Sequence, residues 1–314
     1  MNRTLKPRNL GDILSDTFTI YKNNFWRLAA IVAIVAVPIA VLYLIVELLF
    51  PAHDGGATGT LANAIFSLLL SVTSSVVFLL MGGAVIHAVS EQYFNQPVNI
   101  GRAYSFAWDR LSDMFWATVL AGLAIYGILV AATIISLFTS MAIGVGISGW
   151  QGMMAFTAIL LIIATPPALY LGITWTFIVQ AALLEDCGPR AALSHSSALV
   201  KRSWWRVLGI VLLLVIIVMI ITMIFYMPAI ISYVKQFAAG FVPYATIEPS
   251  IWVMIATMIG GLIGDIICIP IFTISATLLY FDLRVRKQGY SLDALANELG
   301  LTSAPTDTGA NLPG

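Results

Sequence analysis

The chain has few charged residues. Only 10% of its 314 residues are charged, whereas 60% are hydrophobic. A soluble domain carries about 25% charged residues, so this composition excludes a globule whose surface faces water. The net charge is zero and no long block of one sign occurs, so we expect no nucleic-acid partner.

Residues that bind metals or form disulfides are also scarce. Cys187 follows one apolar run and Cys268 lies inside another, so the two cysteines are expected at different depths and no disulfide is predicted. The three histidines are scattered, without the spacing of a metal site. No nucleophilic triad or phosphate-binding loop is present either. We therefore expect no catalytic residue, no cofactor and no metal, and the chain is predicted not to be an enzyme.

Long apolar runs are what the sequence has in abundance. The hydrocarbon core of a bilayer is about 30 Å thick, which a helix of about 20 residues crosses. The runs are continuously apolar and do not alternate, which favours helices over a β-barrel. The sequence thus predicts an all-α membrane protein with six transmembrane helices, at Arg27–Leu49, Leu61–Ser90, Met114–Phe138, Gly152–Leu184, Arg206–Ser232 and Ile251–Phe281.

The cations predict how the spans are oriented. Fourteen of the fifteen Lys and Arg residues fall on one side of the predicted spans, and Lys235 alone falls on the other. Cytoplasmic segments of membrane proteins carry this excess. We expect a multi-pass protein of the cell membrane with both termini in the cytoplasm.

A weak internal repeat divides the chain into three units. The segment Leu10–Trp26 aligns with Ile100–Trp116 at a shift of 90 residues, and a further shift of 89 brings a third aromatic pair into register. The aligned pairs are Phe25-Trp26, Phe115-Trp116 and Trp204-Trp205. We predict a single six-span domain at 1–300 with repeats at about 10–99, 100–187 and 188–300. Residues 301–314 are predicted to form a disordered cytoplasmic tail.

Each predicted repeat begins with an amphipathic helix, at 12–25, 102–115 and 191–203. In the first, Leu14, Phe18, Tyr21 and Phe25 share one helical face. Such helices lie along membrane surfaces, and Trp favours the headgroup level. Each predicted repeat is therefore an interfacial amphipathic helix followed by a two-span hairpin.

The third amphipathic segment has the most conspicuous polar character. It interrupts two long apolar runs and carries four cations and a tryptophan pair. Its candidate contacts to lipid headgroups are Arg190, Lys201, Arg202, Arg206, Trp204 and Trp205. Two interpretations stay open: a topology signal that anchors the chain at the surface, or a specific site for anionic lipid.

Three motifs, in order along the chain, are similar to those of a known family. They are "LGDILSDTFTIYKNNFWRL", "ALLEDCGPRAALSHSSALVKRSWWRVLGIVLLL" and "LLYFDLRVRKQGYSLDALANELG". They resemble the glycerophosphoryl diester phosphodiesterase membrane-domain family, whose members are prokaryotic six-span proteins. Some members are fused to a catalytic barrel, which takes about 200 residues or more. The longest segment outside the predicted spans here has 33 residues, 282–314. The resemblance thus implies a stand-alone membrane unit without the hydrolase and carries over no catalytic residue.

Asp265 is a candidate polar site within the membrane. An acid in hydrocarbon is costly, so it is expected to face the bundle interior or water. It is either a hydrogen-bonded structural residue or a proton, cation or substrate contact. Two function classes follow. We expect a non-enzymatic protein that organises lipid or a partner at the inner membrane surface. The alternative is a small-solute or ion transporter or channel that uses Asp265 and helices kinked at Pro166-Pro167 and Pro270.

Overall fold

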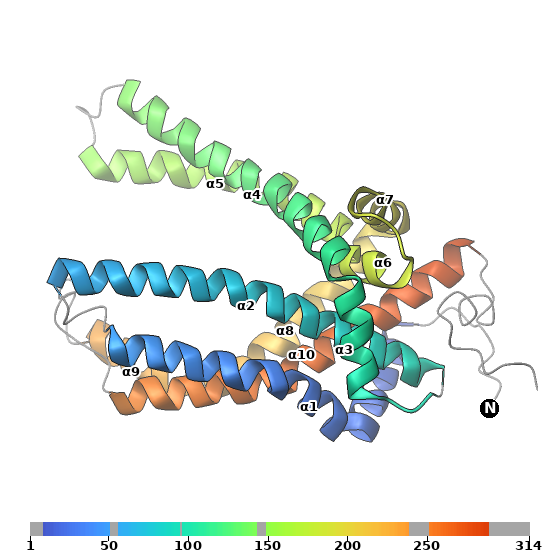
Figure 1. Cartoon of the computed structure of the whole chain (residues 1–314). Coiled ribbons are helices and arrows are strands. Elements are labelled where there is room, and N and C mark those ends of the chain that lie inside the picture. Colours follow the sequence, from blue (N-terminus) through green and yellow to red (C-terminus); the bar gives the residue numbers. More distant parts are fainter. Residues whose placement is uncertain (1–8, 51–55, 95, 143–148, 239–250, 289–314) are drawn as a thin grey trace, which may run out of the picture.

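The computed structural model describes residues 9–50, 56–94, 96–142, 149–238 and 251–288, and nearly all of them are helical (Figure 1). The predicted tail at 301–314 lies outside these ranges. No strand occurs within them, and their helices are α1 (Leu10–Leu49), α2 (Gly56–Tyr93), α3 (Ile100–Asp109), α4 (Leu111–Ala142), α5 (Gly149–Thr174), α6 (Ile178–Leu184), α7 (Pro189–Val200), α8 (Trp204–Phe225), α9 (Met227–Ala238) and α10 (Ile251–Gln288).

Six stretches are long and apolar enough to cross a membrane, which confirms the predicted all-α, six-span architecture. They are Leu10–Leu49, Leu61–Tyr93, Leu111–Thr139, Met154–Leu184, Trp204–Phe225 and Ile251–Lys287. Large apolar side chains cover their outer surfaces. Leu123 exposes 68% of its surface, and Phe138 and Ile162 each expose 70%. Lipid tails are as apolar as these side chains, so in a bilayer this exposure costs little.

The first span begins earlier than the predicted Arg27, because α1 joins the amphipathic segment to the span in one bent helix. It starts where the Asn9 backbone N–H donates to the Asp12 carboxylate over 2.9 Å. Only Asn24 leaves the helical region within α1, with φ −127° and ψ 17°. Its side-chain amide donates to the Ile20 carbonyl over 3.2 Å and so provides that carbonyl with a hydrogen bond at the bend.

The fourth predicted span, Gly152–Leu184, is in fact two helices. α5 ends at Thr174 and α6 starts at Ile178. The turn leaves backbone N–H and C=O groups without helical partners, and inside a protein such groups need other hydrogen-bond partners. The Ser196 hydroxyl on α7 is the partner of two of them: it donates to the Thr174 carbonyl over 2.9 Å and accepts from the Phe177 N–H over 3.3 Å. The break therefore lies where a neighbouring helix offers a hydroxyl.

The prolines do not interrupt their helices. α5 runs on through Pro166 and Pro167, and α10 runs on through Pro270. Whether these prolines kink their helices, as expected, stays a prediction. Within membrane-spanning helices, a lost backbone hydrogen bond is often compensated by neighbouring groups, so a proline need not end the helix.

Gly260 and Gly264 lie where α10 packs against the end of α8. A Cβ added at Gly260 would lie 2.2 Å from the Phe225 carbonyl oxygen, and one at Gly264 would lie 3.7 Å from the Phe225 ring. The absence of a side chain at Gly260 is what lets the end of α8 lie against the backbone of α10.

The helices are packed most closely at one end of the bundle. α1 packs against α2 and α10, α10 against α8, and α4 against α5. Figure 1 shows α4 and α5 diverging from the other spans toward the end that carries α9. The opposite end carries α3, α6 and α7, and we call it the elbow end. Here four consecutive residues of α10, Leu278 to Phe281, are fully buried.

The predicted amphipathic segments are helical except at Arg110 and at residues 201–203, which form turns. The first belongs to α1, the second comprises α3 and the first turn of α4, and the third is α7. A single residue, Arg110, separates α3 from α4. Whether the three segments are copies of one repeat stays a prediction.

Candidate functional site

Three enclosed acids lie at the elbow end, and each ends one of the even-numbered spans. Glu91 closes the second span, Glu185 follows the fourth, and Asp282 lies in the last turns of the sixth. Their side chains are 0%, 8% and 3% exposed. A carboxylate withdrawn from water is costly unless it is paired and hydrogen-bonded. Each of these three meets a basic residue.

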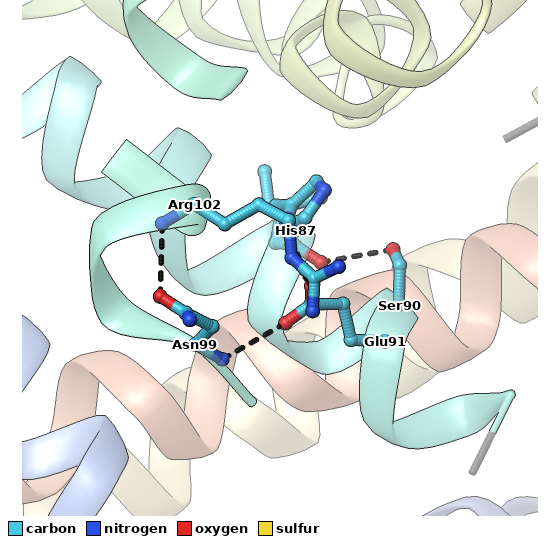
Figure 2. A network of polar contacts seen from close by, with 6 residues as sticks. His87, Ser90, Glu91, Asn99 and Arg102 are labelled. Atoms are coloured by element: carbon cyan, nitrogen blue, oxygen red, sulfur yellow. Dashed lines mark hydrogen bonds and ion pairs between the residues drawn. The ribbon is translucent and has the colours of Figure 1, made fainter. Parts of the chain in front are cut away.

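Glu91 joins α2 to the start of α3 (Figure 2). Its carboxylate lies 2.7 Å from Arg102 Nε and accepts the Asn99 backbone N–H over 3.2 Å. The Asn99 side chain in turn caps α3 by accepting the Arg102 backbone N–H over 3.1 Å. His87 Nδ1 is 3.9 Å from Glu91 Oε1, and its ring lies 4.3 Å from the ring of Phe106. The acid therefore fixes the direction in which the chain leaves the second span.

Glu185 joins α6, α7 and α10. It accepts a hydrogen bond from the Tyr280 hydroxyl through Oε1 and contacts His195 Nδ1 through Oε2. Arg284 Nε lies 3.8 Å from Oε1. The carboxylate thus contacts an aromatic hydroxyl and a guanidinium of the sixth span on one side and an imidazole of α7 on the other.

Cys187 lies beside this cluster and is half-buried. Burial, together with the nearby Glu185 and Asp113 carboxylates, raises the pKa of its thiol to about 11. The thiol therefore keeps its proton at neutral pH, and a protonated thiol is a poor nucleophile. In this state Cys187 is not suited to covalent catalysis.

Asp282 joins α8 to α10. Its Oδ2 atom lies 2.9 Å from Arg206 Nη2 and 2.9 Å from Arg286 Nε. One of the predicted lipid contacts, Arg206, is therefore engaged by an enclosed carboxylate of its own chain.

Two further contacts tie the neighbouring segments together. Arg110 Nη1 donates to the Leu183 carbonyl over 2.8 Å and lies 3.2 Å from the Asp186 carboxylate. The Tyr104 hydroxyl donates to the Ile31 carbonyl over 2.6 Å. Burial raises the pKa of Tyr104 to about 12, so this donor keeps its proton well above neutral pH. The helix α3 is thus bound to the first span, and the start of α4 to the fourth.

The other predicted headgroup contacts differ in their surroundings. Arg190, Lys201, Arg202 and Trp205 are exposed. Trp204 is half-buried, with its ring stacked 5.8 Å from that of Tyr170. The predicted set therefore divides into four exposed residues and two, Trp204 and Arg206, that contact the protein itself.

Asp265 lies apart from the three acids. It precedes Asp282 by 17 residues on α10, about 25 Å along a helix. Its side chain is exposed at the protein surface, and among the described residues none donates a hydrogen bond to it or pairs with it. The structure therefore brings no described polar partner to this candidate site.

Sequence reasoning missed Glu91 and Glu185 as organising residues, and it did not bring Glu185, Cys187 and His195 together. One signal could have found the acids, because each even-numbered apolar run is followed by one, in "VSEQY", "LLEDC" and "YFDLR". The grouping of Cys187 with His195 depends on the turn between α6 and α7, which no spacing rule predicts.

Comparison with protein-family models, curated proteins and solved structures gives no match to this chain. The resemblance to the glycerophosphoryl diester phosphodiesterase membrane-domain family therefore stays a prediction from the three motifs. What the cluster can do chemically has to be argued from its own geometry.

Proposed function

We propose that this protein is a non-catalytic, multi-pass protein of the cell membrane that organises lipid or a protein partner at the inner surface. The observation that carries the proposal is the exposure of three tryptophans, each within two residues of the end of an amphipathic segment. Trp26, Trp116 and Trp205 expose 82%, 53% and 79% of their surfaces. Exposed tryptophans of membrane proteins favour the level of the headgroups.

The aromatic pairs support the three-repeat plan. The rings of Phe25 and Trp26, of Phe115 and Trp116, and of Trp204 and Trp205 meet edge to face at 5.2, 5.4 and 4.8 Å. In the proposed plan, each unit is an interfacial amphipathic helix followed by a hairpin of two spans. The packing of α1 on α2, of α4 on α5 and of α8 on α10 agrees with three hairpins.

The excess of cations at the elbow end favours an orientation with this end in the cytoplasm. Single cysteines introduced at 50–60, 139–151 or 233–250 should then react with an impermeant thiol reagent added outside intact cells. Cysteines introduced near 100 or 195 should react only after the membrane is opened. Labelling at 195 in intact cells would contradict the proposed orientation.

The cations of α7 and the turn after it are the proposed contacts to anionic headgroups. Arg190, Lys201 and Arg202 are exposed, whereas the arginines Arg102, Arg110 and Arg206 face acids of the chain. A cation close to an anionic membrane surface contributes about 1 kcal/mol. Three such residues on one segment therefore supply enough attraction to prefer an anionic lipid to a neutral one.

This preference can be tested on the delipidated full chain in detergent. Phosphatidylglycerol should raise the temperature of thermal unfolding more than phosphatidylcholine does, and added salt should reduce the difference. The variant in which Arg190, Lys201 and Arg202 are all glutamine should lose most of the difference. Lys235→Gln is the matched control, because Lys235 is also exposed but lies on α9, and it should behave as the native chain. A full response to phosphatidylglycerol in the triple variant would contradict the proposed lipid role.

Transport is the second candidate, and the exposed Asp265 carboxyl within the sixth span is the observation that favours it. A carboxyl at this depth is costly in lipid, which is typical of residues on ion or substrate paths. The pocket between α8 and α10 does not include Asp265 in its lining and is apolar, being lined by Val215, Val218, Met219, Thr222, Met223, Tyr226 and Phe272. A lining of this kind suits an acyl chain better than an ion, so the first proposal is preferred.

A further inference from the structure

Three side chains of metal-ligating types meet at the turn between α6 and α7. Glu185, Cys187 and His195 each offer one ligand atom, and these atoms all lie within 4.8 Å of one another. In a tetrahedral zinc site, bonds of about 2.0–2.3 Å place neighbouring ligand atoms about 3.3–3.8 Å apart. The three atoms are spread more widely than in a zinc site, and His195 Nδ1 contacts Glu185 Oε2 directly, so side-chain rotations are needed to admit an ion between them.

The local backbone is what brings these residues to one point. Asp186 has φ 47°, the left-handed conformation, which turns the chain sharply between Glu185 and Cys187. Gly188 and Pro189 then start α7, with Pro189 in the first turn. The Ser196 hydroxyl anchors α7 to the break between α5 and α6 and so fixes the rotation of the helix that carries His195.

A second layer of contacts already orients the glutamate. The Tyr280 hydroxyl donates to Glu185 Oε1, while Oε2 is the oxygen that faces His195. Metal ligands in proteins are usually held by such outer hydrogen bonds. The side chain of Glu185 is 8% exposed and that of His195 is 46% exposed, so the cluster is anchored on one side and reachable from water on the other.

The charges around Cys187 favour a cation. Two carboxylates, those of Glu185 and Asp186, directly precede Cys187 in the chain. A divalent ion at the cluster would offset their negative charge. Arg110 lies 3.2 Å from the Asp186 carboxylate, whereas Glu185 Oε2 contacts His195 within the cluster.

We propose that Glu185, Cys187 and His195 bind one transition-metal ion of the zinc class, with a fourth position open to water. The donors are one carboxylate oxygen, one thiolate sulfur and one imidazole nitrogen, a set that suits Zn²⁺ and that Mg²⁺ and Ca²⁺, which take oxygen ligands, do not prefer. On binding, the thiol proton passes to solvent and the ion takes its place beside the sulfur. The ion links α6 to α7 and, through Tyr280, to α10.

Metal content of the purified full chain is the first measurement. The protein in detergent is stripped with a chelator, dialysed against Zn²⁺ and analysed for bound zinc, and we expect one equivalent per chain. Replacement by Co²⁺ should give the thiolate-to-cobalt charge-transfer absorption in the near ultraviolet. Cys187→Ser and His195→Ala should abolish both signals. Cys268→Ser, which removes the other cysteine, should retain them.

Tyr280→Phe tests the second layer. It leaves all three ligands in place and removes one hydrogen bond to Glu185, so it should weaken zinc affinity by about tenfold or more, the effect seen for outer-shell partners. An unchanged affinity in this variant would show that the carboxylate oriented by Tyr280 does not bind the ion, and it would remove Glu185 from the proposed site.

Protection of Cys187 from alkylation tests the site without any substitution. In the stripped native chain, Zn²⁺ should slow the reaction of Cys187 with iodoacetamide, followed by mass spectrometry, and Mg²⁺ should not. Zinc binding retained in full by Cys187→Ser would overturn the proposal. Alkylation of Cys187 that proceeds at the same rate in saturating Zn²⁺ would also overturn it.

Discussion

Removing either partner of the Glu91–Arg102 pair should destabilise the protein, but by unequal amounts. The Glu91 side chain is 0% exposed, whereas that of Arg102 is 54% exposed. In Glu91→Gln, the arginine can turn into water and the new amide oxygen can still accept the Asn99 N–H, so we expect a cost of about 1 kcal/mol or less. In Arg102→Gln, an enclosed carboxylate loses its cation and cannot reach water.

The cost of Arg102→Gln can be bounded from the same geometry. Breaking a buried pair by removing one partner costs about 3–5 kcal/mol. Water around the exposed part of Arg102 screens the pair, and the Asn99 N–H still donates to Glu91 in the variant. We therefore expect about 2–3 kcal/mol, at the low end of the range for buried pairs. The double variant should cost less than the sum of the two single variants, because it leaves no enclosed charge.

The measurement is the reversible unfolding of the native chain, the two single variants and the double variant in mixed detergent micelles. It gives the change in the free energy of unfolding for each of the three variants. His87→Gln serves as the control for the polar surroundings, since His87 lies 3.9 Å from Glu91 but is not its cation. Equal costs for the two single variants, or additive costs in the double variant, would refute the reasoning that the enclosed carboxylate depends on Arg102.

Three other predictions follow from single contacts. Gly260→Ala should cost about 1–3 kcal/mol in thermal unfolding, because the new Cβ would lie 2.2 Å from a backbone oxygen, whereas Gly264→Ala, with 3.7 Å to the nearest ring atom, should change stability little. Tyr104→Phe should cost about 1 kcal/mol. Since burial raises the pKa of Tyr104 to about 12 from an ordinary value of about 10, its contribution is full below pH about 10 and declines between about 10 and 12, and the Phe variant should lack this part of the alkaline decline. Asp265→Asn should leave unfolding and any solute or proton flux in reconstituted vesicles unchanged; flux that only the native chain supports would favour transport instead.

The spans could be predicted from the sequence because the signals for them are local. A run of apolar residues predicts a span by its own length. Two glycines four residues apart, such as Gly260 and Gly264, are typical of a close contact with another helix, whichever helix that is. The amphipathic segments are recognised in the same way, from the spacing of residues such as Leu14 and Phe18 on one face.

The acid cluster could not be predicted, because its contacts join residues that are far apart in the chain. Glu185 meets a tyrosine 95 residues away, and Arg110 meets a carbonyl 73 residues away. Arg206 illustrates the consequence. Its place beside two tryptophans indicates a lipid contact, but Asp282 from the sixth span lies 2.9 Å from it. Which cations face lipid and which face acids is decided by the packing of the spans, so a residue count cannot separate them.

The distances along the chain between each acid and its partners have a consequence for how the protein is made. Glu91 meets Arg102 as soon as the next few residues leave the ribosome, since only the loop between α2 and α3 separates them. Glu185 can contact His195 nearly as early, but its tyrosine arrives only with the last span, and Asp282 itself belongs to that span. The early contacts thus join the end of each hairpin to the amphipathic helix that follows it, and α10, the last of the spans, supplies the remaining partners. A chain that stops short of Tyr280 would leave Glu185 without its tyrosine and Arg206 without its carboxylate. We expect such a chain to be less stable and therefore more open to proteolysis.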